Sequence, residues 1–121
     1  MYGILHSKKG FTLVELIVTV IIIGVLASVA IPMMTANVDK AKKSEAMAAL
    51  GAYRTAYRLY TAEWGSAPAS KNAMNAWVKD TDVDGKYFNN SHYSLSGATM
   101  TATNGTLSCN MNLANGEIGN Y

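Results

Sequence analysis

The pattern of apolar and polar positions changes along the chain, from a nearly continuous apolar run to a mixed pattern. Between Phe11 and Ile31, 14 of the 21 residues are Phe, Leu, Val or Ile, and polar residues are few. Roughly 20 apolar residues cross a bilayer as a helix, so the pattern predicts a transmembrane helix over residues 11–32. Beyond this segment, apolar positions recur at helical spacing and later alternate, which predicts an amphipathic helix followed by strands.

Glu15 lies close to the start of the apolar segment. Each large apolar residue near the centre of a membrane helix favours insertion by about 0.3–0.6 kcal/mol, so fourteen contribute roughly 4–8 kcal/mol. A charge at the centre costs about 2.5–3.5 kcal/mol, and less near an end. The sequence therefore predicts that the segment inserts despite its carboxylate.

The residues before the apolar segment form a short basic leader. Lys8 and Lys9 are followed directly by Gly10, and the charge bias of membrane proteins places this end in the cytoplasm. The segment differs from a secretory signal because its apolar run exceeds 15 residues and no small-x-small cleavage site closes it. Gly10, which lacks a side chain, suits a protease that cuts at the cytoplasmic face.

The run Lys8-Lys9-Gly10-Phe11-Thr12-Leu13-Val14-Glu15 resembles the class III signal of type IV pilins and pseudopilins. The resemblance continues through Gly24 to Pro32 and covers about the first third of the chain. It implies cleavage between Gly10 and Phe11 by a prepilin peptidase, which removes residues 1–10, and N-methylation of Phe11.

The resemblance also implies an assembly pathway. The precursor would lie in the bacterial inner membrane as a single-pass protein with a cytoplasmic N-terminus. Its helix would then join a homo-oligomeric extracellular pilus filament, driven by a cytoplasmic ATPase through a membrane platform protein. Glu15 would pair with the Phe11 amine of a neighbouring subunit, and a buried carboxylate without such a partner must protonate.

Gly24 and Pro32 make the end of the apolar helix its least secure part. Pro32 removes one backbone hydrogen bond and crowds the carbonyl of Ser28, while Gly24 costs roughly 1 kcal/mol relative to Ala. The resemblance implies unwinding here on assembly, and a simple kink is the alternative.

Residues 33–64 contain no proline and have the pattern of an amphipathic helix that ends before Gly65. The predicted apolar face comprises Val38, Ala41, Ala49, Ala52, Tyr53, Ala56, Tyr60 and Trp64. Met47 and Leu50 fall on the opposite, basic face, so we predict that they contact a neighbouring subunit.

Two clusters on this helix have alternative interpretations. Tyr53, Tyr57, Tyr60 and Trp64 form an aromatic stripe, which we interpret as the core beneath a sheet rather than an electron-transfer path. Lys40, Lys42 and Lys43 are interpreted as a solvated face rather than a DNA contact. Nucleic acid is not indicated as a partner, because the chain without its two leader lysines has no net side-chain charge.

Residues 65–121 predict a small antiparallel β module. A short helical turn is expected within residues 72–80, and Thr99–Asn112 has the alternation of a hairpin with Asn104-Gly105 at its turn. Further strands are expected around His92–Ser96 and Glu117–Tyr121. The predicted fold class is α+β and pilin-like, with one long N-terminal helix and a small sheet packed on its C-terminal half.

Candidate chemistry in this module is sparse. Asp80, Asp82 and Asp84 precede Gly85 as in the first half of a calcium loop, but Ser91 replaces the expected bidentate Glu. An acidic solvated turn is therefore the preferred interpretation, with calcium as the alternative and no other cofactor expected. The single cysteine, Cys109, excludes an intramolecular disulfide, and no catalytic motif is present, so we predict a non-enzymatic protein.

These features predict a structural subunit of a type IV pilus. A pseudopilin of a type II secretion-like system is the second interpretation, ranked lower because the tail lacks the tryptophan-glycine-proline-tyrosine-type segment associated with its major subunit. From another class, the alternative is a single-span membrane protein with a ligand-binding or calcium-binding module. No motif in the sequence assigns the filament to motility, adhesion, DNA uptake, secretion or electron transfer.

Overall fold

The computed structural model describes residues 3, 9–105 and 107–119. A long helix, α1 (Leu13–Trp64), is followed by two short 3-10 helices, a four-residue helix and four strands. These are η1 (Lys71–Met74), α2 (Asp80–Val83), η2 (Asn90–His92), β1 (Tyr93–Ser96), β2 (Thr99–Asn104), β3 (Leu107–Asn112) and β4 (Ile118–Gly119). The chain divides into two compact units, residues 1–36 and 37–121, which are described separately.

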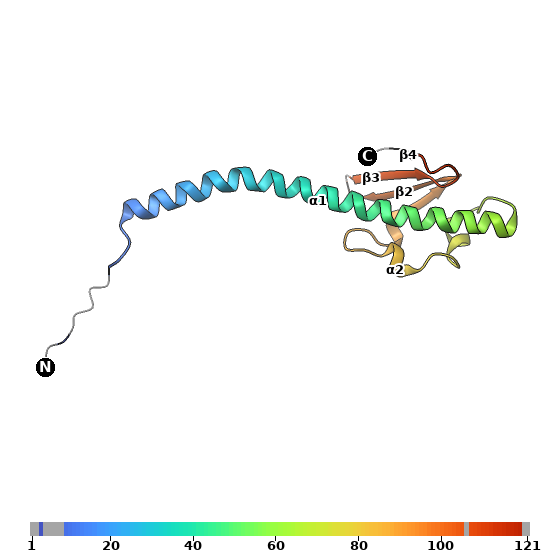
Figure 1. Cartoon of the computed structure of the whole chain (residues 1–121), viewed down its shortest axis with the longest axis horizontal. Helices are drawn as coiled ribbons and strands as arrows, with labels where there is room; N and C mark the ends of the chain where they lie inside the picture. The colour runs from blue at the N-terminus through green and yellow to red at the C-terminus, as the bar shows by residue number, and fades with distance from the viewer. Residues whose placement is uncertain (1–2, 4–8, 106, 120–121) are drawn as a thin grey trace. The chain divides into compact units, whose positions relative to one another are not determined.

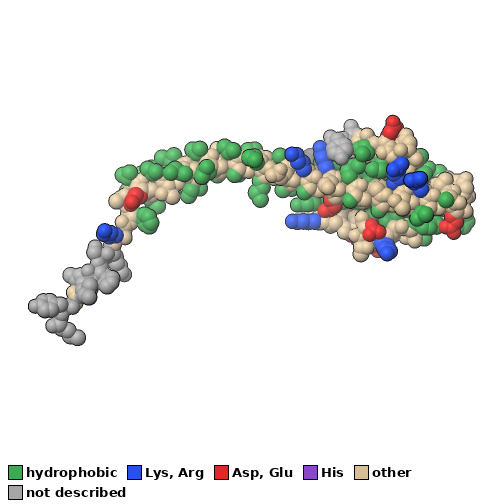
Figure 2. Space-filling view, viewed as in Figure 1, with side chains coloured by type: hydrophobic (Ala, Val, Ile, Leu, Met, Phe, Trp, Pro, Cys, Tyr) green, Lys and Arg blue, Asp and Glu red, His purple; other side chains and the backbone are tan. Residues whose placement is uncertain are grey.

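The first unit contains the N-terminal part of α1, and its apolar side chains have no cover within the chain. Every large hydrophobic residue between Phe11 and Met34 is at least 48% exposed. Figure 2 shows these side chains as a nearly continuous apolar surface along the helix. The helix is long and apolar enough to cross a membrane by length and composition.

The second unit begins with the C-terminal part of α1, which ends where the sequence predicts. Gly65 has a φ of +68°, a left-handed conformation that glycine adopts without a steric penalty. Its backbone N–H donates to the carbonyl of Thr61 at 2.9 Å, which satisfies one of the last helical acceptors. Trp64 is therefore the final helical residue, and Gly65 is its C-terminal cap.

The four strands form one antiparallel sheet in the order β1-β2-β3-β4. Figure 1 shows this sheet alongside the C-terminal part of α1, which confirms the predicted α+β, pilin-like fold. Asn104 pairs with Leu107, so the hairpin loop begins at Gly105, one residue later than the predicted Asn104-Gly105 turn. The last strand is limited to Ile118–Gly119, and residues 120–121 of the expected strand lie outside the described part.

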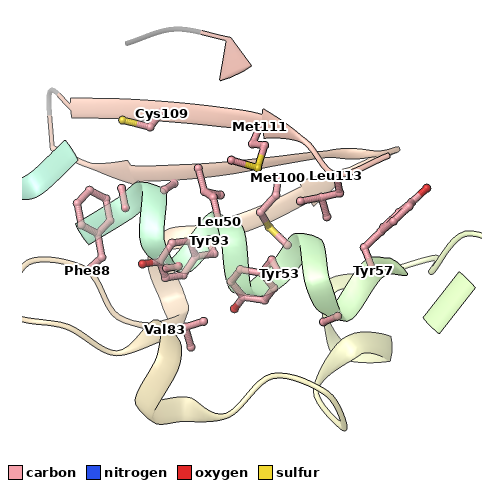
Figure 3. Close-up of a cluster of buried hydrophobic side chains, with 14 of the residues drawn as sticks. Leu50, Tyr53, Tyr57, Val83, Phe88, Tyr93, Met100, Cys109, Met111 and Leu113 are labelled. Carbon is pink, nitrogen blue, oxygen red and sulfur yellow. The ribbon is translucent and has the colours of Figure 1, made fainter. Parts of the chain in front are cut away.

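The core of the second unit lies between α1, the sheet and the segment that contains α2. Figure 3 shows Leu50 and Tyr53 of α1 between strand residues on one side and Val83 on the other. The strand residues alternate as predicted, since Met100 and Cys109 are fully buried. Burial of one such side chain contributes roughly 1.5–3 kcal/mol, so this small core holds the sheet on the helix.

Candidate processing and assembly site

The predicted cleavage junction lies in a non-helical segment just before α1. Gly10 and Phe11 precede the first helical residue, Leu13, and Phe11 is 91% exposed. A Cβ at Gly10 would meet no atom within 4 Å. The peptide bond between them is therefore accessible in the isolated chain. Lys8, part of the predicted leader, lies outside the described residues.

Thr12 and Glu15 form a capping box at the start of α1. The Thr12 backbone N–H donates to Glu15 Oε2 at 2.9 Å, and the Thr12 hydroxyl donates to the same oxygen at 3.0 Å. In return, the Glu15 backbone N–H lies 3.2 Å from Thr12 Oγ1, its acceptor. These contacts satisfy groups that a helix N-terminus leaves unpaired. The Thr-x-x-Glu signal was visible in the sequence, but our sequence analysis missed Thr12 as a partner of Glu15.

Gly24 and Pro32 both lie within the continuous helix α1. A Cβ at Gly24 would meet nothing within 4 Å, so no packing in the isolated chain explains this glycine. Downstream of Pro32, the Thr35 hydroxyl donates to the Pro32 carbonyl at 2.9 Å. The helix therefore passes through both positions in the isolated chain, and its unwinding on assembly stays a prediction.

The proposed neighbour contact of Leu50 requires correction, whereas that of Met47 stays a prediction. Leu50 is fully buried in the core of its own unit, and Met47 is partly buried against that core. The predicted apolar face of α1 was too narrow, because Ala46, Leu50 and Tyr57 are also covered. The physical reason is that the helix packs against the sheet and against the segment containing α2. Leu50 thus cannot contact a neighbouring subunit in this fold.

The aromatic stripe of α1 separates into two environments. Tyr53 and Tyr57 are buried in the core, which confirms the core interpretation for them, whereas Trp64 is 64% exposed. The Tyr53 ring lies 5.3 Å from that of Tyr93, and burial, with Asp84 and Asp80 nearby, raises the pKa of Tyr53 to about 12.

The three acidic residues of the calcium hypothesis lie in and after α2. Asp80 and Asp82 belong to this four-residue helix, and Asp84 follows it. Asp84 Oδ1 accepts a hydrogen bond from the Asn90 backbone N–H at 2.7 Å. Within the described residues, no three His, Cys, Asp or Glu side chains are arranged to hold a metal ion. The geometry gives no support for a calcium site, and metal binding stays an untested prediction.

Glu45 of α1 anchors the loop between α2 and the sheet. Its Oε1 accepts hydrogen bonds from the backbone N–H groups of Tyr87 and Phe88, both at 2.8 Å, and its Oε2 accepts from Lys86 at 3.1 Å. A Cβ at Gly85 would lie 2.3 Å from the Glu45 carboxyl carbon, so a larger residue there would displace the carboxylate from its present position. Sequence reasoning missed this contact because no local pattern links residues more than 40 positions apart.

Further hydrogen bonds fix the same loop. The Tyr53 hydroxyl donates to Asn90 Oδ1 at 3.2 Å, and Lys71 Nζ donates to the Asn90 carbonyl at 2.5 Å. From β2, the Asn104 side-chain amide donates to the Tyr87 carbonyl. The loop is thus tied to α1, to η1 and to the sheet, and its surface residues occupy defined positions.

Comparison with known proteins identifies the N-terminal segment first. Residues 5–31 match the family described as the prokaryotic N-terminal methylation motif. This range contains the predicted cleavage junction, Glu15 and Gly24. The match therefore supports the interpretation of this segment as a prepilin signal and places the boundary of the motif next to Pro32.

Relatives that match 64–86% of the chain extend the similarity into the second unit. The chain is 36% identical over 104 residues to the fimbrial protein EcpC of Eikenella corrodens, covering 86% of this chain and 63% of the relative. It is 30% identical over 78 residues to the type II secretion system core protein G of Klebsiella michiganensis, covering 64% and 55%. With the type IV major pilin protein PilE1 of Neisseria gonorrhoeae it shares 32% identity over 80 residues, covering 66% and 48%.

The chain spans about half to two thirds of the length of these relatives. No solved structure matches it. The N-terminal motif, the long apolar helix and the relatives agree with one another, and the resemblance inferred from residues 8–32 is confirmed. The chain is related to the type IV pilins and to the pseudopilins of type II secretion systems.

Proposed function

We propose that this chain is a structural, non-enzymatic subunit of a type IV pilus. The observation that carries the proposal is the unpartnered apolar surface of α1 between Leu13 and Met34. Sixteen large hydrophobic side chains between Phe11 and Met34 are exposed there, and burial of each stabilises by roughly 1.5–3 kcal/mol. Such a surface requires a membrane or other copies of the chain, and a filament subunit uses both in turn.

Processing would precede assembly. A prepilin peptidase would cut between Gly10 and Phe11, in the non-helical segment ahead of α1, and the new Phe11 amine would be N-methylated. The released N-terminus would then lie one residue from Thr12, which already hydrogen-bonds Glu15. A cation on Phe11 of a neighbouring subunit would be the natural partner of the Glu15 carboxylate once both are removed from water.

The location and partners follow from the same cycle. The precursor would lie in the bacterial inner membrane with a cytoplasmic N-terminus, and the assembled subunit would belong to an extracellular homo-oligomeric filament. The sequence contains no phosphate-binding Gly-rich loop with Lys and no catalytic motif that would supply energy. Extraction from the membrane would therefore depend on an assembly ATPase and a platform protein.

A pseudopilin of a type II secretion-like system is the second candidate, because core protein G relatives match this chain at 30–33% identity. The pilus is favoured by the extent of the similarity. The fimbrial relative covers 86% of the chain, whereas these core protein G relatives cover 60–64%.

Mass spectrometry of the protein from its source tests processing. A chain that begins at methylated Phe11 is expected, while an intact Met1 terminus would favour a membrane-anchored module. Electron microscopy of sheared cell-surface material then distinguishes a pilus from a secretion pseudopilus. Surface filaments that disappear when the gene is deleted are expected, whereas loss of protein secretion without loss of surface filaments would favour the pseudopilin.

Glu15→Ala tests the role of the carboxylate in assembly. The variant keeps the apolar segment, so it is expected to insert in the membrane at the normal level. It should yield at least tenfold fewer filaments, which corresponds to a loss of about 1.4 kcal/mol for each contact between Glu15 and Phe11 of a neighbour. The matched control is Glu63→Ala, which removes an exposed carboxylate from the last turn of the same helix. Normal filament yield from Glu15→Ala would contradict the proposed pairing.

A further inference from the structure

A group of lysines surrounds the point where α1 enters the second unit. Lys40, Lys42 and Lys43 lie on α1, and Lys86 lies on the loop that Glu45 anchors. We call these four residues the neck lysines. Figure 2 shows basic side chains on opposite edges of the chain where this unit begins. A solvated helix face accounts for the three lysines of α1, but it does not account for the position of Lys86, which comes from a distant part of the sequence and lies over the same Tyr87 ring as Lys42.

Three of the neck lysines follow the apolar segment closely in the sequence. Lys40 comes eight residues after Pro32, and Lys42 and Lys43 come shortly after Lys40. The polar layer on each side of a bilayer is about 5–8 Å thick. Helical side chains lean toward the N-terminus, and long lysine side chains extend their ammonium groups toward the interface. Lys40, Lys42 and Lys43 are therefore juxtamembrane residues of a span that ends near Pro32, and the attraction of anionic headgroups extends over a Debye length of about 8 Å.

The lysines also point in several directions. Lys40 and Lys42 are two positions apart, so they project on nearly opposite sides of α1, about 160° from each other. Lys43 lies on a third side, where its charge acts on Cys109 of β3. A nucleic acid contacts one side of a helix, whereas a membrane that the helix crosses surrounds it. The distribution therefore fits a membrane surface better than a DNA duplex.

The anchored loop adds an aromatic ring to the cluster. Lys42 Nζ and Lys86 Nζ lie 5.8 Å and 5.5 Å from the centre of the Tyr87 ring. Tyrosine is favoured at the membrane–water interface because its ring is apolar and its hydroxyl is polar. The Glu45 carboxylate binds three backbone N–H groups of this loop, and Asp39 is an acidic neighbour of the cluster, with its Oδ1 3.7 Å from Lys42 Nζ.

We propose that the neck lysines and Tyr87 bind anionic phospholipid headgroups while the subunit is stored in the membrane. The phosphate groups of the outer leaflet would contact the lysines, and Tyr87 would lie at the level of the headgroups. Each lysine close to an anionic surface increases the affinity about fivefold. Because not every neck lysine reaches the headgroups, we expect a preference of roughly three- to tenfold for anionic over zwitterionic lipid. The inference rests on the membrane-stored stage of the proposed function and does not require a filament.

The test uses the full chain reconstituted in phosphatidylcholine vesicles that contain trace spin-labelled lipid. Electron paramagnetic resonance gives the association of phosphatidylglycerol relative to phosphatidylcholine with the protein. We expect the three- to tenfold preference in low salt and its loss at 1 M salt, where the Debye length is about 3 Å. Lys42→Gln with Lys86→Gln should lower the preference at least twofold, whereas Lys79→Gln, which removes an exposed lysine outside the cluster, should not change it.

Glu45→Gln distinguishes lipid binding at a site held by the anchored loop from attraction that depends only on the net charge of the chain. The substitution makes the chain more positive, so a charge-only effect would raise the preference for phosphatidylglycerol. If the anchored loop builds the site, the preference should fall because Lys86 and Tyr87 lose their positions. A raised preference, or none in the unaltered chain, would overturn the inference.

A second measurement addresses nucleic acid. Lysine methylation followed by mass spectrometry compares Lys86 with Lys79 in the full chain. Phosphatidylglycerol vesicles should protect Lys86 several-fold relative to phosphatidylcholine vesicles, and duplex DNA added to phosphatidylcholine vesicles should not. Protection by DNA alone would overturn the lipid proposal. Failure of the filament experiments with this lipid preference intact would instead contradict only the proposed pilus function.

Discussion

The two halves of α1 differ in whether their apolar side chains are covered by the chain itself. Between Leu13 and Met34 the helix carries large aliphatic side chains that its own chain leaves exposed, whereas between Ala46 and Tyr57 it carries mostly alanine and tyrosine that the chain buries. Small residues allow the sheet and the loop to approach the helix closely. The first half is thus complete only with partners outside the chain, and the second is complete alone.

Glu15 and Glu45, one in each half, differ in the same way, because one has a local partner and the other has distant partners. Glu15 caps its own helix through Thr12, three residues away. Glu45 instead accepts three backbone hydrogen bonds from a loop more than 40 residues away. A local cap can be exchanged for another partner at small cost, whereas removal of Glu45 would leave three N–H groups unpaired. One carboxylate is suited to assembly and the other to the fold.

The largest effect is expected from Leu50→Ala in the second half. This substitution leaves a cavity beside Tyr53 and should lower the free energy of unfolding of the second unit by about 2–5 kcal/mol. Leu59→Ala, at a position that is 49% exposed on the same helix, should change it by less than about 0.5 kcal/mol. Urea unfolding of the full chain in detergent, followed by near-ultraviolet circular dichroism, measures both. Equal effects would contradict the assigned core.

Alkaline pH should destabilise the second unit through its buried tyrosines. Burial raises the pKa of Tyr53 to about 12, above its ordinary value of 10, and burial likewise raises the pKa of Tyr93. The unfolded chain therefore loses these protons first. Their contribution is complete below pH 10 and is lost as the pH rises toward 12, on the order of 1 kcal/mol per pH unit for each tyrosine.

Tyrosinate absorbance and urea unfolding at a series of pH values test this expectation. Tyr53→Phe should weaken the dependence of stability on pH between 10 and 12, because one of the two responsible protons is removed. Tyr60→Phe is the control, since Tyr60 lies outside the buried core. A chain with the same stability at pH 9 and pH 12 would contradict the burial of these hydroxyl groups.

Gly85→Ala should disturb the loop that Glu45 anchors. The new methyl group would lie 2.3 Å from the Glu45 carboxyl carbon, so the carboxylate must move and release backbone N–H groups, at a cost of about 1–3 kcal/mol. Gly51→Ala is the matched control, because a Cβ there meets nothing within 4 Å and alanine favours the helix. It should stabilise by up to about 1 kcal/mol. Urea unfolding is expected to show changes of opposite sign in the free energy of unfolding for the two variants. If both substitutions were stabilising, the contact between Gly85 and Glu45 would be contradicted.

Thr12→Ala is expected to give the smallest effect, confined to the first turn of α1. Loss of the capping hydroxyl should cost about 1 kcal/mol and increase hydrogen exchange of the amides in residues 13–16 several-fold. Thr12→Ser should restore protection because it keeps the hydroxyl. Exchange unchanged by Thr12→Ala would show that the capping box does not hold in the membrane-mimetic environment.

The sequence determined the features that depend on neighbouring residues. The apolar run, the prepilin-type signal, the end of α1 at Gly65 and the alternation of Met100 and Cys109 were all predicted, because period and turn chemistry are local. The hairpin loop was misplaced by one residue, since its position depends on which residues pair across β2 and β3.

Only the tertiary structure decided how elements distant in sequence meet. It placed Leu50 inside the core, because α1 is covered by the loop as well as by the sheet. It joined Glu45 to Gly85 and brought Lys86 and Tyr87 beside Lys42, contacts across more than 40 residues that no periodicity encodes. Local patterns specify which faces are apolar, but the packing of several elements determines how wide the covered face is and which charges gather at its edge.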